Sequence, residues 1–229
     1  MYLLGIIYIA VMLLFAKIIL KYKYKKYILN LLALFLLSYK VIEYTIYGLN
    51  LEITKVPLEF STVSYFIFSS AVLFKMRGLY SIAAFIAFIS GIGYLLAFSI
   101  VGDIFIAEQG LNTTLIALVN HSILFLGSMI VISQHKLDKS ESKHIIKFTV
   151  IYLIYVIVLN LFFDFSKERI FIQMLLGIDF SSISVESISY LYLLYFLVLV
   201  IMYQFVMNMF FFINKQIMMK GEESYEHSI

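Results

Sequence analysis

Polar and ionisable side chains interrupt several long apolar segments of this sequence, and they are the residues that could do chemistry. Lys40 and Glu43 stand three residues apart, a spacing that puts both side chains on one face of a helix, where they can pair. Glu59, Ser61 and Thr62 open the next apolar segment. Because an ionisable group near the centre of a bilayer costs about 2.5–3.5 kcal/mol, such groups indicate either a functional site or a structural pairing.

Two further polar pairs occur later in the chain. Asn120 and His121 lie about two turns into one apolar segment, and Asn160 and Asp164 share a face near the end of another. His121 belongs to a stripe of small and polar residues, which predicts that its ring faces other helices and not lipid. Counted from the outer ends of their segments, all these groups lie at a comparable depth of about 5–12 Å. The sequence therefore predicts a polar cavity that opens outward or into the outer leaflet.

Each of these residues also has a purely structural interpretation. A Lys40–Glu43 pair can simply clamp one helix, and His121 can be a hydrogen-bonded packing residue. Ser61 and Thr62 can bond to the backbone of their own helix, as hydroxyl side chains often do. The residue types alone leave these interpretations open beside a site for chemistry.

The composition predicts a helical membrane protein. Residues of the set AVILMFWYC make up 63% of the chain and charged residues 14%, whereas about a quarter of a typical soluble domain is charged. The apolar segments are roughly 18–26 residues long, which is enough to cross a hydrocarbon core of about 30 Å. We therefore expect an all-α, polytopic helical bundle in the cell membrane, with membrane lipids as its partners.

Seven membrane spans are expected. They lie near residues 3–20, 27–47, 57–74, 79–101, 113–133, 145–163 and 188–213. Pro57 is expected in the first turn of the third span, where a proline is tolerated. The connection 164–187 is expected to include a short helix along the interface. Residues 1–213 would form one transmembrane domain, followed by a short cytoplasmic tail over 214–229.

The positions of the basic residues predict the orientation of the spans. Of the 17 Lys and Arg residues, thirteen lie in the loops and tail on one side, and three (Lys55, Lys167 and Arg169) lie on the other. Lys40 lies inside a span. Cytoplasmic loops carry the excess of Lys and Arg, so the amino terminus is expected outside and the carboxyl terminus in the cytoplasm.

Several classes of chemistry are disfavoured by the sequence. The net charge of +3 is modest and follows the loops, a pattern that reflects topology and not a nucleic-acid surface. The chain has no cysteine, hence no disulfide and no thiolate metal site. The four histidines include no HExxH motif, and the seventh span carries no lysine for a Schiff base. No metal and no cofactor are expected.

Two segments resemble the YwaF-type bacterial integral membrane proteins. The first is LSYKVIEYTIYGLNLEITKVPLEFSTVSYFIF, over residues 37–68, and the second is NHSILFLGSMIVI, over residues 120–132. The family's pattern is an acidic residue that ends one span, a glycine-containing outer loop, and a proline-led motif with a cysteine that opens the next span. A histidine follows in a later span. The resemblance covers the middle of the chain.

The resemblance implies acyl-chain chemistry at a lipid-accessible site within the membrane, by a lipid acyltransferase or an ester hydrolase. Relatives of that family include a eukaryotic acyltransferase that remodels phospholipids through a Cys and a His. Carried onto this chain, the nucleophile falls at Ser61, in place of the family's cysteine, and the base at His121. Thr62 is the alternative nucleophile.

The supporting residues follow from the same interpretation. Glu59 or Glu43 would orient the imidazole, and Asn120 or Lys40 would stabilise the oxyanion. The other hypothesis is a non-catalytic transporter or lipid-binding protein whose polar cavity faces outward. Against a transporter, the sequence shows no inverted repeat and no pair of broken helices.

Overall fold

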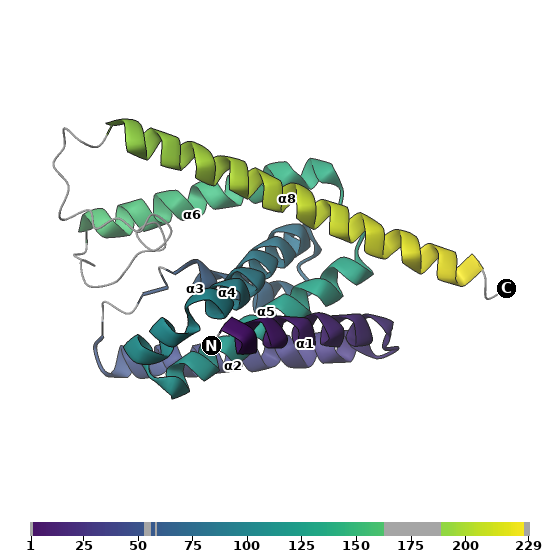
Figure 1. Cartoon of the computed structure of the whole chain (residues 1–229), viewed down its shortest axis with the longest axis horizontal. Coiled ribbons are helices and arrows are strands. Elements are labelled where there is room, and N and C mark those ends of the chain that lie inside the picture. Colours follow the sequence, from purple (N-terminus) through teal and green to yellow (C-terminus); the bar gives the residue numbers. More distant parts are fainter. Residues whose placement is uncertain (1, 53–55, 58, 163–188, 227–229) are drawn as a thin grey trace.

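The computed structural model describes residues 2–52, 56–57, 59–162 and 189–226, and every regular element within these ranges is helical. The α-helices are α1 (Tyr2–Lys21), α2 (Lys25–Leu49), α3 (Phe60–Leu73), α4 (Tyr80–Gln109), α5 (Leu111–Gln134), α6 (Ser142–Phe162) and α8 (Ser189–Glu226) (Figure 1). Two short 3-10 helices, η1 (Arg77–Leu79) and η2 (Lys139–Glu141), precede α4 and α6. The expectation of an all-α fold is confirmed.

Within the described residues, five helical segments are long and apolar enough to cross a membrane. They are Leu3–Lys21, Lys25–Leu49, Arg77–Gln109, Leu111–Gln134 and Leu197–Met219. The apolar helix α3 is shorter, at 14 residues. Large apolar side chains such as Leu14, Leu31 and Phe205 stand exposed on these helices, as a lipid-facing surface requires. Helix length and hydropathy thus indicate a multi-pass membrane protein.

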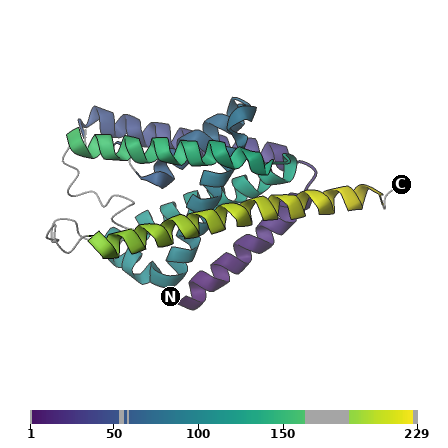
Figure 2. The ribbon, with the colours of Figure 1, turned by 90° about the horizontal axis from the view of Figure 1, so that it is seen from above.

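The helix boundaries differ from the expected spans at three places. The placement of Pro57 in the first turn of α3 is wrong, because Glu59 is still extended (φ −64°, ψ 137°) and the helix begins at Phe60. Helix α4 continues past residue 101, with an irregular residue at Val101 (φ −127°, ψ 24°) where the expected span ended. Helix α8 continues past residue 213 to Glu226 and extends beyond the rest of the bundle (Figure 2). The expected interfacial helix over 164–187 lies outside the described residues.

Helix α4 is the centre of the bundle and packs against α1, α3, α5, α6 and α8. Its closest neighbour is α5, because small residues line the contact: Ala83 and Ala87 are buried, and Gly91 lies directly against the α5 backbone. A Cβ added at Gly91 would stand 2.6 Å from the amide nitrogen of Phe125 and 2.8 Å from the carbonyl oxygen of His121. The small residues therefore let the backbones of α4 and α5 approach each other closely.

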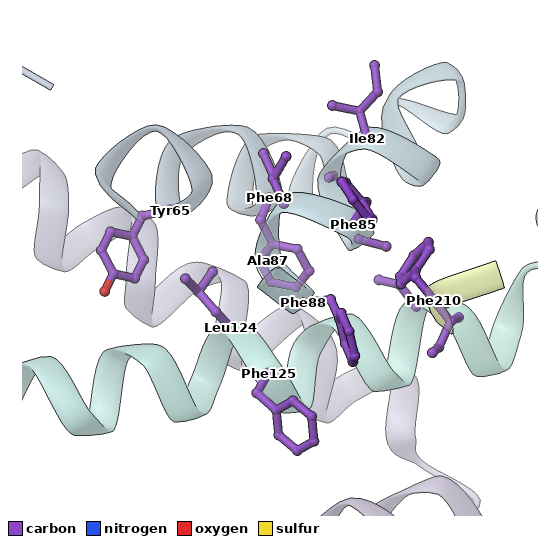
Figure 3. Packing of buried hydrophobic residues seen from close by; sticks show 14 of the residues in the cluster. Tyr65, Phe68, Ile82, Phe85, Ala87, Phe88, Leu124, Phe125 and Phe210 are labelled. Carbon is purple, nitrogen blue, oxygen red and sulfur yellow. The ribbon is translucent and has the colours of Figure 1, made fainter. Parts of the chain in front are cut away.

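An aromatic cluster joins α3, α4, α5 and α8. Phe85 packs edge-on against Phe210, with ring centroids 5.3 Å apart and an interplanar angle of 75°. Phe88 packs against Phe210 from the next turn of α4, with centroids 5.6 Å apart. Figure 3 shows Tyr65 at one end of this cluster and Phe210 at the other. The buried aromatic core thus leads from α8 to the polar residues around Tyr65.

A single side chain of α8 fixes the end of α5 opposite this polar region. Asn214 is 1% exposed and donates to the carbonyl oxygens of Ile132 (2.6 Å) and His135 (2.9 Å). Its Oδ1 accepts from the backbone amide of Leu137 at 3.0 Å. Asn214 thus satisfies carbonyls that the helix end leaves without intrahelical partners, and it attaches α8 to α5.

Candidate functional site

Lys40 extends the buried stripe of α2 into the polar region. The buried positions of this helix are Leu29, Ala33, Leu36 and Lys40, which recur every three or four residues. Lys40 is 9% exposed, and its Nζ lies 2.5 Å from Oε2 of Glu43. The predicted pairing of Lys40 with Glu43 is confirmed.

Two tyrosine rings complete the surroundings of the Lys40 ammonium. Its Nζ lies 5.3 Å from the ring centroid of Tyr39 and 4.9 Å from that of Tyr65, within the range of cation–π attraction. Tyr39 also donates its hydroxyl to Oε1 of Glu43 at 3.3 Å. The ammonium is therefore held by one carboxylate and two aromatic faces, from helices α2 and α3.

The His121 ring is buried between α4 and α5, as expected, and is 7% exposed. Its Nδ1 lies 2.8 Å from the backbone carbonyl oxygen of Ser90, with the hydroxyl of the same serine 3.4 Å away. A carbonyl can only accept, so in the neutral imidazole Nδ1 carries the proton and Nε2 keeps a free lone pair. The ring is thus held in the tautomer that a general base at Nε2 requires.

Two tyrosines pack against this imidazole. Tyr94 stacks on it with centroids 4.2 Å apart and an interplanar angle of 1°, and Tyr65 lies 5.7 Å away at 59°. Tyr65 therefore contacts both the His121 ring and the Lys40 ammonium. The buried hydroxyl of Tyr94 has no hydrogen-bond partner among the described residues, although a buried polar group normally has one.

The two hydroxyls proposed as nucleophiles are engaged elsewhere. Ser61 is half-buried and donates to Oε2 of Glu59 at 3.3 Å. Thr62 is 5% exposed, and its side chain lies next to that of Tyr44 on α2. Within the described ranges, no hydrogen bond joins either hydroxyl to His121.

The contacts described above bring Lys40, Glu43, Tyr65 and His121 together in one chain. Ser61 and Glu59 form a separate pair.

Asn120 lines an apolar groove between α2 and α5. The groove has a volume of about 250 Å³ and is lined by Phe35, Tyr39, Leu115, Ile116, Val119 and Asn120. Most of these side chains are exposed at the surface of the bundle, so the groove opens to its surroundings. Tyr39 connects the groove to Glu43, and Asn120 adjoins His121 in sequence. The groove therefore lies beside the polar residues.

Sequence reasoning missed four residues of this site: Tyr39, Tyr65, Ser90 and Tyr94. A signal was present for Tyr65, which follows Ser61 by four residues and shares its helix face. A tyrosine in an aromatic-rich chain gives no other sign of a polar role. Of the predicted pair Asn160 and Asp164, the Asn160 side chain and all of Asp164 lie outside the described residues.

In the described ranges, no three His, Asp or Glu side chains gather closely enough to hold a metal ion. Comparisons with protein-family models, with curated proteins and with solved structures found no match to the chain. The resemblance to the YwaF-type proteins remains a prediction from the two quoted segments.

Proposed function

We propose that this protein is a seven-span membrane protein with its amino terminus outside and that the outer half of its bundle binds a membrane lipid. The orientation is supported by the thirteen Lys and Arg residues on one side and three on the other. In this orientation α2 runs outward and α5 inward, so Glu43 and the start of α5 lie in the outer leaflet.

The observation that carries the proposal is the groove beside the Lys40–Glu43 pair. An apolar groove open to lipid accepts an acyl chain without desolvating a polar group. The exposed lining of the groove is almost entirely apolar, and Tyr39, one of its lining residues, is hydrogen-bonded to Glu43, beside which the ester or head group of that lipid would lie. An apolar groove that lies beside a polar pair is an arrangement that suits a lipid, whose acyl chain is apolar and whose head group is polar.

Fluorescence quenching tests this function, because the chain contains no tryptophan. Leu31 lies one turn beyond Phe35 on the same face of α2 and is 66% exposed, so Leu31→Trp places a reporter where a bound acyl chain would continue. Leu14→Trp, on the lipid-facing surface of α1 at a similar distance from the helix end, is the matched control.

Phospholipids brominated on their acyl chains, diluted into bilayers of unlabelled lipid, should quench Leu31→Trp at lower mole fractions than Leu14→Trp. Bulk lipid exchanges freely around both reporters, so only a bound lipid produces this difference. Equal quenching curves for the two reporters would refute the lipid-binding function.

A second candidate function is acyl transfer, with Ser61 as nucleophile and His121 as base. It is supported by the Ser90 carbonyl, which leaves Nε2 of His121 able to take a proton. In that reaction the Ser61 hydroxyl turns from Glu59 toward His121, and Oγ bonds to the acyl carbon as Nε2 takes its proton. The ester C–O bond then breaks, and the proton passes to the departing alkoxide. A lysolipid or water then releases the acyl group from Ser61.

A further inference from the structure

The surroundings of the Lys40 ammonium have the composition of a receptor for an ammonium ligand. A carboxylate oxygen lies 2.5 Å from Nζ, and the rings of Tyr39 and Tyr65 lie within 5.3 Å. Carboxylates and aromatic faces are the groups that recognise alkylated ammonium ions in proteins. We call Glu43, Tyr39 and Tyr65 the ammonium cage. In this structure the cage holds the chain's own lysine.

We propose that the ammonium cage recognises the ammonium of a zwitterionic phospholipid, whose phosphate is bound by the displaced Lys40. This inference rests on the proposed binding of a lipid in the groove and names the head group of that lipid. The chemical class comprises phosphatidylethanolamine and phosphatidylcholine, which both join an ammonium to a phosphate. No covalent step is involved.

The position of the cage supports this assignment. Tyr39 belongs both to the cage and to the groove, so a lipid in the groove places its polar end beside Glu43. Phe35 lies one turn away on the same helix face and stacks on Tyr39, with centroids 6.5 Å apart and an interplanar angle of 11°. The stacked rings form a continuous apolar wall along which an acyl chain can lie.

The charges of the cage also favour a zwitterionic ligand. A zwitterionic lipid brings a phosphate and an ammonium to the cage together. Lys40 can then leave Glu43 and pair with the phosphate, while Glu43 pairs with the lipid ammonium. Every charge therefore has a partner both before and after the lipid binds. An anionic lipid without an amine would draw Lys40 away and leave Glu43 without a cation, which is costly for a group with a side chain only 22% exposed.

Head-group selectivity in the Leu31→Trp background tests the proposal. The quenchers are phosphatidylethanolamine, phosphatidylcholine and phosphatidylglycerol with identical brominated chains. Both zwitterionic lipids should compete for the site about fivefold better than phosphatidylglycerol, the ratio that a cation–π contact of ordinary strength gives. If the site binds lipid but has equal affinity for the three lipids, the proposal that the ammonium cage recognises a lipid ammonium is wrong. The proposed lipid-binding function would then still stand.

Three substitutions assign the selectivity to the cage. Tyr39→Leu removes a ring and should bring the ratio of zwitterionic to phosphatidylglycerol affinity close to one. Tyr39→Phe keeps the ring and should retain most of the preference for zwitterionic lipids. Glu43→Gln removes the carboxylate charge and should also abolish the preference, so the proposal can be tested even if Tyr39→Leu does not fold. An unchanged ratio in folded Tyr39→Leu or in folded Glu43→Gln overturns the assignment. Quenching of Leu31→Trp no stronger than that of Leu14→Trp overturns both proposals.

Discussion

Nδ1 of His121 lies 2.8 Å from the backbone carbonyl oxygen of Ser90, so a residue of α4 holds a side chain of α5 in one orientation. The bond forms because Gly91, the next residue, lets the two backbones approach each other. With a side chain at this position the carbonyl and the imidazole would be pushed apart. The small-residue stripe of α4 therefore permits both the close packing of α4 on α5 and the hydrogen bond that sets the tautomer of His121.

The first prediction concerns this close approach. Gly91→Ala should lower the free energy of unfolding by about 1–3 kcal/mol, the usual effect of overpacking, because its Cβ would lie 2.6 Å from the Phe125 amide nitrogen. Thermal unfolding in detergent measures the change. Gly93→Ala on the same helix is the control, since a Cβ there meets no atom within 4 Å. A loss of equal size in both variants would contradict the packing argument.

The second prediction concerns the attachment of α8. Asn214→Leu removes the partners of the Ile132 and His135 carbonyls and of the Leu137 amide. Each buried group left without a partner costs about 1–3 kcal/mol, so the variant should unfold at a clearly lower temperature. Asn208→Leu, at an exposed position of the same helix, should change the unfolding temperature little. Unfolding of Asn214→Leu at the wild-type temperature would show that α8 is held by other contacts.

The third prediction concerns topology, which the absence of native cysteine makes easy to measure. Single cysteines at Gly48 and Asn112 should react with a membrane-impermeant maleimide in intact cells. Cysteines at Lys23 and Lys139 should react only after the membrane is permeabilised, because they lie on the side rich in Lys and Arg. The reverse labelling pattern would mean that the amino terminus is cytoplasmic.

The fourth prediction concerns pH and His135, which follows the last residue of α5. Burial, followed by the positive charges of Arg77 and Lys26, lowers the pKa of His135 below its ordinary value of 6.5. The unfolded chain therefore takes up this proton at a higher pH than the folded protein. The contribution of neutral His135 to the free energy of unfolding is therefore complete above about pH 6.5 and decreases as the pH falls below that value.

His135→Phe tests this contribution, because Phe retains an aromatic ring against Tyr80, whose centroid lies 4.6 Å from that of His135. Unfolding temperatures measured at pH 7.5 and at pH 5 should differ less in the variant than in the wild type. An identical pH dependence in the two proteins would assign the acid sensitivity to other groups.

The fifth prediction separates acyl transfer from lipid binding alone. If Ser61 is the nucleophile and His121 its base, either Ser61→Ala or His121→Ala should reduce acyl transfer between phospholipid and lysolipid by at least about 10²–10⁴-fold. The double variant should be hardly worse, because nucleophile and base act as one unit. Ser61→Cys should keep substantial activity, since a thiolate is a strong nucleophile.

Thermal unfolding of each variant must accompany this assay, because the loss of a buried hydrogen bond can imitate a catalytic loss. If Ser61→Ala is fully active and Thr62→Ala is inactive, the nucleophile is Thr62 and not Ser61. Absence of turnover in the wild type, with lipid binding retained, would leave lipid binding as the function.

The sequence by itself determined the helices and the faces that they bury. Apolar segments long enough to cross a bilayer appear as α-helices, and the stripe of small and polar residues that includes His121 indicated that its ring faces other helices. The pairing of Lys40 with Glu43 was predictable as well, because residues three apart on one helix are always neighbours. Each of these features depends on local periodicity, which a sequence displays directly.

Only the tertiary structure decided which polar groups meet. It placed Tyr65 of α3 between the Lys40 ammonium of α2 and the His121 ring of α5, and it directed His121 to a backbone carbonyl of α4. It also left Ser61 beside Glu59. These contacts depend on the rotation and depth of each helix relative to its neighbours. Those quantities are set by how side chains interlock across helices, and the periodicity of one helix carries no record of them.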